Sequence, residues 1–129
     1  MREFFQYLGV VVILILSLAG CKSMTSESPI YLYKVLSTDD WEKSQNSKVL
    51  SLPAMDSKFI HLSKEDQLES ICKKYFGTGS KYMVLKLETS KLTGKLVLEA
   101  NPGGKNKYYH LYEGSIPLNS IVESRSVGD

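Results

Sequence analysis

The N-terminal segment sets the strongest limit on what this chain can fold into. The run from Leu8 to Ala19 (LGVVVILILSLA) contains no charged residue and follows a start that carries Arg2. It is shorter than the ~20 residues that a helix needs to cross the hydrocarbon layer, so it is typical of the apolar part of a secretory signal peptide. If residues 1–20 are removed as a signal peptide, about 100 residues remain, and a chain of that length supports one hydrophobic core.

The end of this segment predicts how the mature chain is held at a membrane. The sequence LAGC, which ends at Cys21, is similar to the bacterial lipobox, in which the cysteine thiol receives a diacylglyceryl group before the signal peptide is cut off. We therefore expect acyl chains on Cys21 that anchor the protein to the bilayer without spanning it. Lys22 stands where an Asp would favour the inner membrane of a Gram-negative bacterium, so the outer membrane is favoured. A signal anchor that is never removed is the alternative.

The expected organisation after the signal peptide is a tether followed by one domain. Residues 21–29 are small and polar and end in Pro29, which is the composition of a flexible tether, so the folded domain is expected over residues 30–125. The formal net charge of the chain is only +2, without a long basic run, which argues against a nucleic-acid surface. The sequence also lacks the glycine-rich, P-loop and zinc-protease motifs.

Strand-like runs and two helical segments follow one another along this domain. Strands are predicted at 30–36 and 58–62, and a short helix at 39–45 after several side chains that can cap it. Ser63 is predicted to cap the main helix, which Gly77 ends. One face of this helix is apolar, with Leu68, Ile71, Cys72, Tyr75 and Phe76 at spacings of three and four. Cys72 is therefore expected to be buried, and it has no disulfide partner in the mature chain.

Four more strand-like runs follow, at 81–88, 95–100, 108–113 and 121–125. Helices come early and strands dominate late, so the expected fold class is α+β. We expect a single small domain with a mixed or antiparallel sheet, one main helix and one short helix.

Polar side chains near the ends of the predicted strands are the candidate site residues. His61 lies just before the predicted start of the main helix, where free N–H groups attract a carboxylate or a phosphate. Its imidazole would add a hydrogen-bond donor or carry a proton. The alternative is that His61 only hydrogen-bonds a neighbouring strand.

The second group of candidates lies on the late strands. Glu99 ends an apolar strand, where a carboxylate needs either water or a partner, and His110 and Tyr112 share one face of their strand if it alternates regularly. Two histidines and a glutamate are also ligand types of an open zinc or iron site. None of their spacings is a local metal signature, so no metal site is predicted.

Five ordered blocks of the sequence resemble the successive blocks of the bacterial family catalogued as domain of unknown function 952. They are IYLYKVLSTDDWEK, FIHLSKEDQL, VLKLETSKL, LVLEA and YYHLYEGSIPLNSI. The resemblance extends from about Ile30 to Ser124. That family is structurally similar to the ADP-ribosyltransferase fold, a split pair of small sheets with a cleft that holds NAD in active relatives. The resemblance therefore implies an ADP-ribosyltransferase-like domain.

The resemblance also implies a function. His61 corresponds to the residue that holds the nicotinamide-side ribose in those enzymes, and the expected ligand is nucleotide-like, of the NAD or ADP-ribose class. If the domain is catalytic, the expected step is cleavage of the nicotinamide–ribose bond, with Glu99 offering negative charge to the developing cation. The expected ligand-binding residues are His61, Ser63, Gln67, His110 and Tyr112, and the expected catalytic residues are His61 and Glu99. The alternative is a non-catalytic envelope lipoprotein that acts as a protein-binding adaptor.

Overall fold

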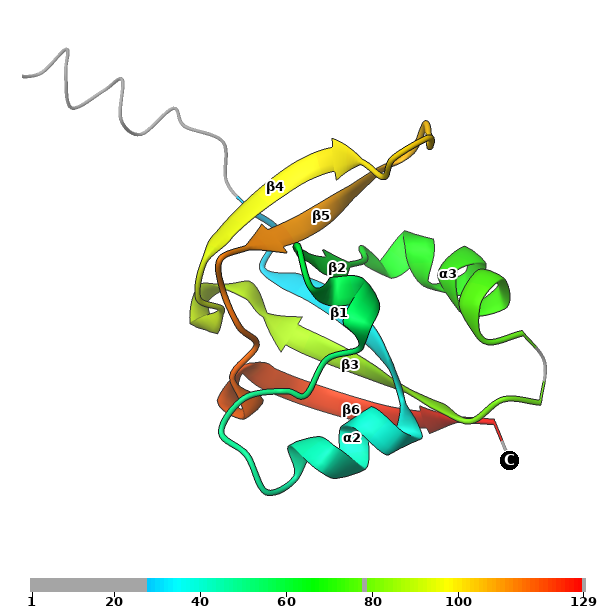
Figure 1. Ribbon diagram of the computed structural model, residues 1–129, viewed down its shortest axis with the longest axis vertical. Coiled ribbons are helices and arrows are strands. Elements are labelled where there is room, and N and C mark those ends of the chain that lie inside the picture. The colour runs from blue at the N-terminus through cyan, green and yellow to red at the C-terminus, as the bar shows by residue number, and fades with distance from the viewer. Residues whose placement is uncertain (1–27, 78, 129) are drawn as a thin grey trace, which may run out of the picture.

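The computed structural model describes residues 28–77 and 79–128, which form two three-stranded sheets and two α-helices. These elements follow one another as β1, α2, β2, α3, β3, β4, β5 and β6, with short 3₁₀ turns between several of them (Figure 1). Every strand pair is antiparallel. The α+β class predicted from the sequence is therefore confirmed, with antiparallel sheets.

The first sheet has β3 (Tyr82–Glu88) in the centre, between β1 (Tyr31–Ser37) and β6 (Ile121–Val127). Alternate residues of β1 point into the protein, so that Leu32, opposite Leu87 of β3, is fully buried. This period of two is what a strand with one covered face requires.

The second sheet has β5 (Lys107–Tyr112) in the centre, between β2 (Ile60–Leu62) and β4 (Lys95–Ala100). The two sheets meet beyond the end of β2. There Tyr33 of β1 and Ser63 exchange backbone hydrogen bonds of 2.8 and 2.9 Å. This bridge joins an edge strand of the first sheet, β1, to the end of an edge strand of the second sheet, β2. It therefore places β1 and β2 next to each other.

The hydrophobic core lies between the sheets and takes residues from both. Burying a leucine or isoleucine side chain completely stabilises a fold by about 1.5–3 kcal/mol, so this cluster is the main source of stability. Its buried members are Leu32, Leu36, Leu50, Ile60, Leu62, Met83, Leu85, Leu87, Leu111 and Ile116.

The short helix α2 (Thr38–Ser44) begins directly after β1. Its N-cap is Ser37, whose hydroxyl oxygen accepts a hydrogen bond from the backbone N–H of Asp40 at 3.2 Å. Asp39 and Asp40 lie in the first turn, where carboxylates stabilise the positive end of the helix dipole. The helix predicted at this place is confirmed, one residue earlier.

The main helix begins later than predicted, and Ser63 does not cap it. A 3₁₀ turn (Glu65–Gln67) comes first, and α3 (Leu68–Tyr75) follows. Ser63 is unavailable because its backbone groups are paired with β1, whereas the side chain of Gln67 accepts a hydrogen bond from the backbone N–H of Lys64 at 2.9 Å. The prediction of a serine cap was wrong because Ser63 forms backbone hydrogen bonds with Tyr33 of the other sheet, and the local sequence does not show this contact.

The end of α3 agrees with the prediction. Gly77 has φ of +60°, the left-handed region that favours glycine, and its N–H donates to the carbonyl of Cys72 at 3.1 Å. However, no residue of α3 is fully buried, and Cys72 is only half-buried rather than buried as expected. Tyr75 is 44% exposed. The apolar face of α3 is thus only partly covered by the sheets.

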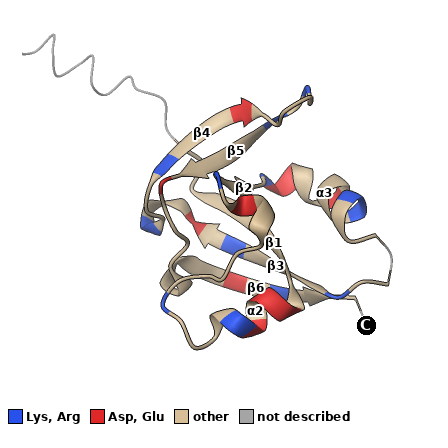
Figure 2. Cartoon of the chain, viewed as in Figure 1, with Lys and Arg blue, Asp and Glu red and all other residues tan. Residues whose placement is uncertain are grey.

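The described residues contain no helix that is long and apolar enough to span a bilayer. The predicted signal peptide at 1–20 and the predicted lipidation site Cys21 lie outside the described residues. Basic residues are spread over several elements and alternate with acidic ones (Figure 2).

Candidate functional site

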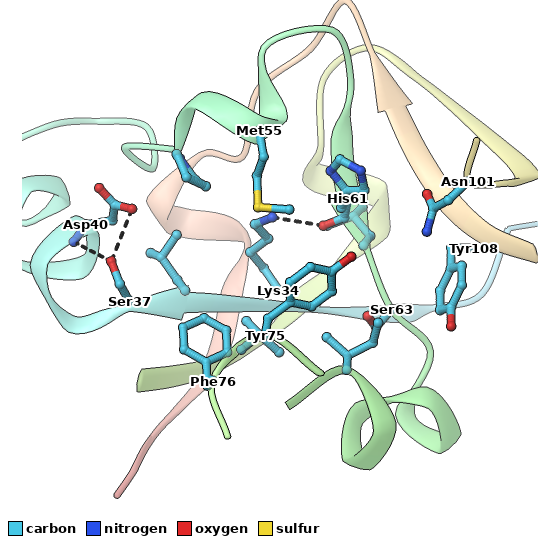
Figure 3. A pocket seen from close by; sticks show the side chains of 15 residues that line it. Lys34, Ser37, Asp40, Met55, His61, Ser63, Tyr75, Phe76, Asn101 and Tyr108 are labelled. Carbon is cyan, nitrogen blue, oxygen red and sulfur yellow. Dashed lines mark hydrogen bonds between the residues drawn. The ribbon is translucent and has the colours of Figure 1, made fainter. Parts of the chain in front are cut away.

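A cavity of about 290 Å³ lies between the last turns of α3 and strands β1 and β2. Figure 3 shows Lys34, His61 and Tyr75 around its middle, Ser37 and Asp40 at one end, and Asn101 and Tyr108 at the other. Most of its wall is apolar or aromatic, and a few polar side chains enter it. Such a combination is typical of small-molecule sites, although the volume lies at the lower end of their usual ~300–1,000 Å³. The lining residues are Lys34, Val35, Leu36, Ser37, Asp40, Pro53, Met55, His61, Leu62, Ser63, Ile71, Tyr75, Phe76, Asn101 and Tyr108.

A buried ion pair lies at the floor of this cavity. Lys34 is one of the alternate residues of β1 whose side chains point into the protein, and it is only 4% exposed. Its Nζ is 2.6 Å from Oδ2 of Asp56, whose side chain is fully buried, and it donates to the backbone carbonyl of His61 at 3.0 Å. Burying an ammonium group without such partners would cost several kcal/mol of folding free energy, about that of removing one partner of a buried pair. Lys34 can therefore occupy this buried position only as part of the ion pair.

The same carboxylate orients His61. Oδ1 of Asp56 lies 2.7 Å from the ring Nδ1 of His61 and accepts its backbone N–H at 3.2 Å. An ionised carboxylate can only accept, so Nδ1 carries the hydrogen and the lone pair of the neutral ring is on Nε2. The His61 side chain is 28% exposed, and it lines the cavity. Asp56 thus sets both the tautomer and the direction of this ring.

The electrostatics of the floor follow from its burial. Burial lowers the pKa of the Lys34 ammonium, and the Asp56 carboxylate beside it acts in the opposite direction through its charge and its hydrogen bond. The two opposite charges balance each other, so the floor of the cavity is close to neutral while His61 is uncharged.

A second polar network connects β4 and β5 beside the cavity. His110 is completely buried, with Nδ1 2.9 Å from Oε1 of Glu99 and Nε2 2.8 Å from Oδ1 of Asn101. The hydroxyl of Tyr112 donates to the same Glu99 oxygen. Hydrogen bonds from Tyr112 and then His110 hold the pKa of the Glu99 carboxyl below its usual value, and Glu99 raises the pKa of Tyr112.

The two networks touch through their imidazole rings. His61 and His110 are opposite each other in the register of β2 and β5, with ring centroids 5.4 Å apart and the rings edge to face. Phe59 stacks on His110 at 4.1 Å and covers it. Asn101 links the second network to the cavity, because it contacts His110 and also lines the cavity.

The structure therefore brings only some of the predicted site residues into one cavity. His61 and Ser63 line it, whereas Glu99, His110 and Tyr112 form the neighbouring network and do not. Gln67 instead ties the start of α3 to β5 by donating to the carbonyl of Lys107 at 2.9 Å. In the described part of the chain, no three His, Cys, Asp or Glu side chains are grouped so that they could hold a metal ion.

The expected anion site at the start of the main helix does not coincide with the cavity. The residues that α3 and its C-cap contribute to the wall are Ile71, Tyr75 and Phe76, from the last turns. The C-terminal end of a helix carries partial negative charge, so this end does not attract anions.

Sequence reasoning missed Lys34 and Asp56. The sequence contained one signal for Lys34. It alternates along the strand on the same side as Leu32 and Leu36, whose side chains point inward, so the Lys34 side chain must also be buried. Asp56 gave no comparable signal, since it lies in a 3₁₀ turn (Ala54–Asp56) far from Lys34 in sequence.

Comparison with known proteins identifies the family. The most similar solved structures include the crystal structure of protein CC0527 from Caulobacter crescentus, with 27% sequence identity, a TM-score of 0.63, and coverage of 74% of this chain and 84% of that one. The solution NMR structure of CC0527 gives 26% identity and a TM-score of 0.60, over 75% and 84% of the two chains. No curated protein matches this chain. Residues 35–124 match the family described as "Protein of unknown function (DUF952)", and because this match covers most of the chain, the protein belongs to the DUF952 family.

Proposed function

We propose that this domain binds a nucleotide-like small molecule of the NAD or ADP-ribose class in the cavity between α3 and β1, in an ADP-ribosyltransferase-like arrangement. The observation that carries the proposal is the side chain of His61, which Asp56 fixes at 2.7 Å with the other ring nitrogen free for a ligand. Aromatic walls formed by Tyr75, Phe76 and Tyr108 supply flat surfaces against which a base can stack.

The geometry supports binding more directly than it supports a reaction. Cleavage of a nicotinamide–ribose bond needs a carboxylate beside the developing cation. Glu99, the predicted carboxylate, is bound by Tyr112 and His110 and does not line the cavity. In this proposal, Glu99 acts on the cavity only indirectly, through His110 and the Asn101 side chain that His110 contacts.

The proposal includes a membrane address. Acylation of Cys21 would hold the domain next to a bilayer, with the outer membrane favoured in a Gram-negative cell. Labelled palmitate should enter the wild-type protein and not the Cys21→Ser variant. Equal labelling of the two proteins, or none in either, would remove this part of the proposal.

Thermal unfolding with added ligand tests the binding function. A ligand that binds only the folded state stabilises it by RT ln(1 + [L]/Kd), which is about 2.7 kcal/mol at a hundredfold excess over Kd. We expect a rise in the melting temperature with NAD, ADP-ribose or one of their nucleoside parts. Release of nicotinamide from NAD in the same samples would extend the function from binding to catalysis.

Two tyrosines provide a matched pair of variants. Tyr75 lines the cavity and Tyr31 does not, yet their exposed fractions are 44% and 43%. Tyr75→Ala and His61→Gln should each abolish the ligand-induced shift, whereas Tyr31→Ala should keep it. The absence of a shift with every nucleotide and nucleoside would refute the proposed function and favour the adaptor alternative.

A further inference from the structure

The charges around the cavity restrict the kind of group that it can accept. Among the described residues that line it, Lys34 is the only cation and Asp40 is the only carboxylate. The charge of Lys34 is already matched by Asp56 at 2.6 Å. Asp40 forms no salt bridge with a described residue, although its charge acts on Lys34 at longer range, and its Oδ2 accepts the hydroxyl of Ser37 at 3.1 Å. When Asp56 is counted, which pairs with Lys34 but does not line the cavity, the charged side chains at the cavity sum to a net negative charge while His61 is neutral.

The helix that closes one side adds to this effect. α3 turns its C-terminal end toward the cavity, through Tyr75 and the C-cap residue Phe76. Carbonyl groups at that end carry partial negative charge, whereas phosphate-binding helices present their N-terminal N–H groups. A phosphate inside the cavity would thus meet no unbalanced positive charge.

The floor nevertheless offers two hydrogen-bonding groups. Two hydrogens of the Lys34 ammonium are used by Asp56 and by the carbonyl of His61, and the third has no acceptor among the described residues. Nε2 of His61 is the matching acceptor, because its Nδ1 carries the hydrogen that faces Asp56. A hydroxyl group can donate to such a nitrogen and accept from such an ammonium at the same time.

We infer that the cavity holds the uncharged, hydroxyl-bearing end of its ligand, a nucleoside, and leaves any phosphate outside. This inference rests on the proposed function and narrows it. The volume of about 290 Å³ agrees with it, since a cavity of that size does not enclose a whole dinucleotide.

Isothermal titration of the full chain, in mild detergent and at low ionic strength, tests the inference. The probes are two matched pairs of an uncharged nucleoside and its 5′-monophosphate, adenosine with its monophosphate and the reduced, uncharged form of nicotinamide riboside with its mononucleotide. In whichever pair binds, the nucleoside should bind roughly fivefold more tightly, which is the size of the repulsion between a phosphate and a carboxylate across a solvated cleft. The difference should shrink with added salt, and inorganic phosphate should not compete.

Charge variants make the test specific. Asp56→Asn frees the charge of Lys34, so the monophosphate should become the tighter ligand. If that variant does not fold, Asp40→Asn replaces it, and the preference for the nucleoside should fall to less than twofold. Asp39→Asn is the matched control, because Asp39 is an exposed neighbour that does not line the cavity, and it should leave the fivefold preference unchanged.

The outcomes separate the inference from the proposed function. Tighter binding of a monophosphate to the wild-type protein would overturn the inference and leave the proposed function standing. No binding of any of the four probes would overturn the inference, and no thermal shift with NAD or ADP-ribose either would overturn the proposed function as well.

Discussion

Removing both partners of the buried ion pair should destabilise the fold no more than removing either partner alone. Asp56→Asn leaves the Lys34 ammonium, which is 4% exposed, without its counter-charge, and we expect a loss of about 4 kcal/mol. Lys34→Met leaves the Asp56 carboxylate with the two N–H donors of His61, at 2.7 and 3.2 Å, so its cost should be about 3 kcal/mol.

The double variant Lys34→Met/Asp56→Asn removes both charges and keeps an amide that can accept from His61. We expect it to lose about 3 kcal/mol, no more than the single variants, so the coupling energy is about 4 kcal/mol. Domains of this size have total free energies of unfolding of about 5–15 kcal/mol. A coupling energy of about 4 kcal/mol is a large fraction of that total, so it is easily measured.

Urea unfolding followed by the fluorescence of Trp41, the only tryptophan in the sequence, provides the assay. Trp41 is partly buried against the core and will report the loss of packing. The exposed pair Lys73 and Glu69, with side chains 78% and 84% exposed, serves as a control cycle and should give a coupling below about 0.5 kcal/mol. Additive effects of Lys34→Met and Asp56→Asn would refute the view that each group is tolerated only because of the other.

Two further predictions concern Glu99 of β4 and the close backbone approach of Gly114, just after β5. Tyr112→Phe should raise the pKa of Glu99 toward its ordinary 4.5, because the Tyr112 hydroxyl is the largest cause of its lowering. A carboxyl whose pKa is lower in the folded state stabilises the fold above the unfolded-state value and loses that contribution as the pH falls through the folded-state value. The difference in free energy of unfolding between the wild type and the variant should therefore narrow below about pH 4.5, as measured by denaturation. If the carbon-13 NMR titration of Glu99 is the same in both proteins, the prediction is contradicted. Gly114→Ala should cost about 3 kcal/mol or more in thermal unfolding, because the new methyl group would overlap the backbone carbonyl of Thr93. Gly103→Ala, where a methyl group meets open space but φ is +78°, should cost only about 1–2 kcal/mol, and similar losses at both positions would show that the close backbone approach is unimportant.

Much of the fold was predictable because alternation and helix spacing are local properties. The strand predicted at 95–100 coincides with β4, and the other late strands differ from the prediction by at most two residues at an end. β2 is shorter than the predicted 58–62, since only Ile60 to Leu62 find partners on β5. The start of the main helix was not predictable, because the pairing of Ser63 with Tyr33 is a contact between distant segments.

The site was less predictable than the fold, for a physical reason. His61 could be singled out because it is a titratable side chain at a strand end, but its function depends on Asp56 and Lys34. Their meeting is set by how β1 is placed against β2, which no local pattern specifies. In the same way, the separation of Glu99 from the cavity follows from the pairing of β4 with β5, which turns its carboxylate toward Tyr112.

The cavity itself follows from how α3 is held. Its start is tied to β5 through Gln67 and its end is turned by Gly77, so the helix cannot settle onto β1 along its whole length. Ile71 and Phe76 remain only half-buried and Tyr75 is 44% exposed, so apolar surface stays in contact with water. Covering that surface would yield about 25 cal/mol for each Å² of apolar area removed from water. A ligand with a flat ring would cover this apolar surface without moving the helix. The incomplete packing of α3 and the fixed orientation of His61 beside it therefore both support ligand binding in the cavity.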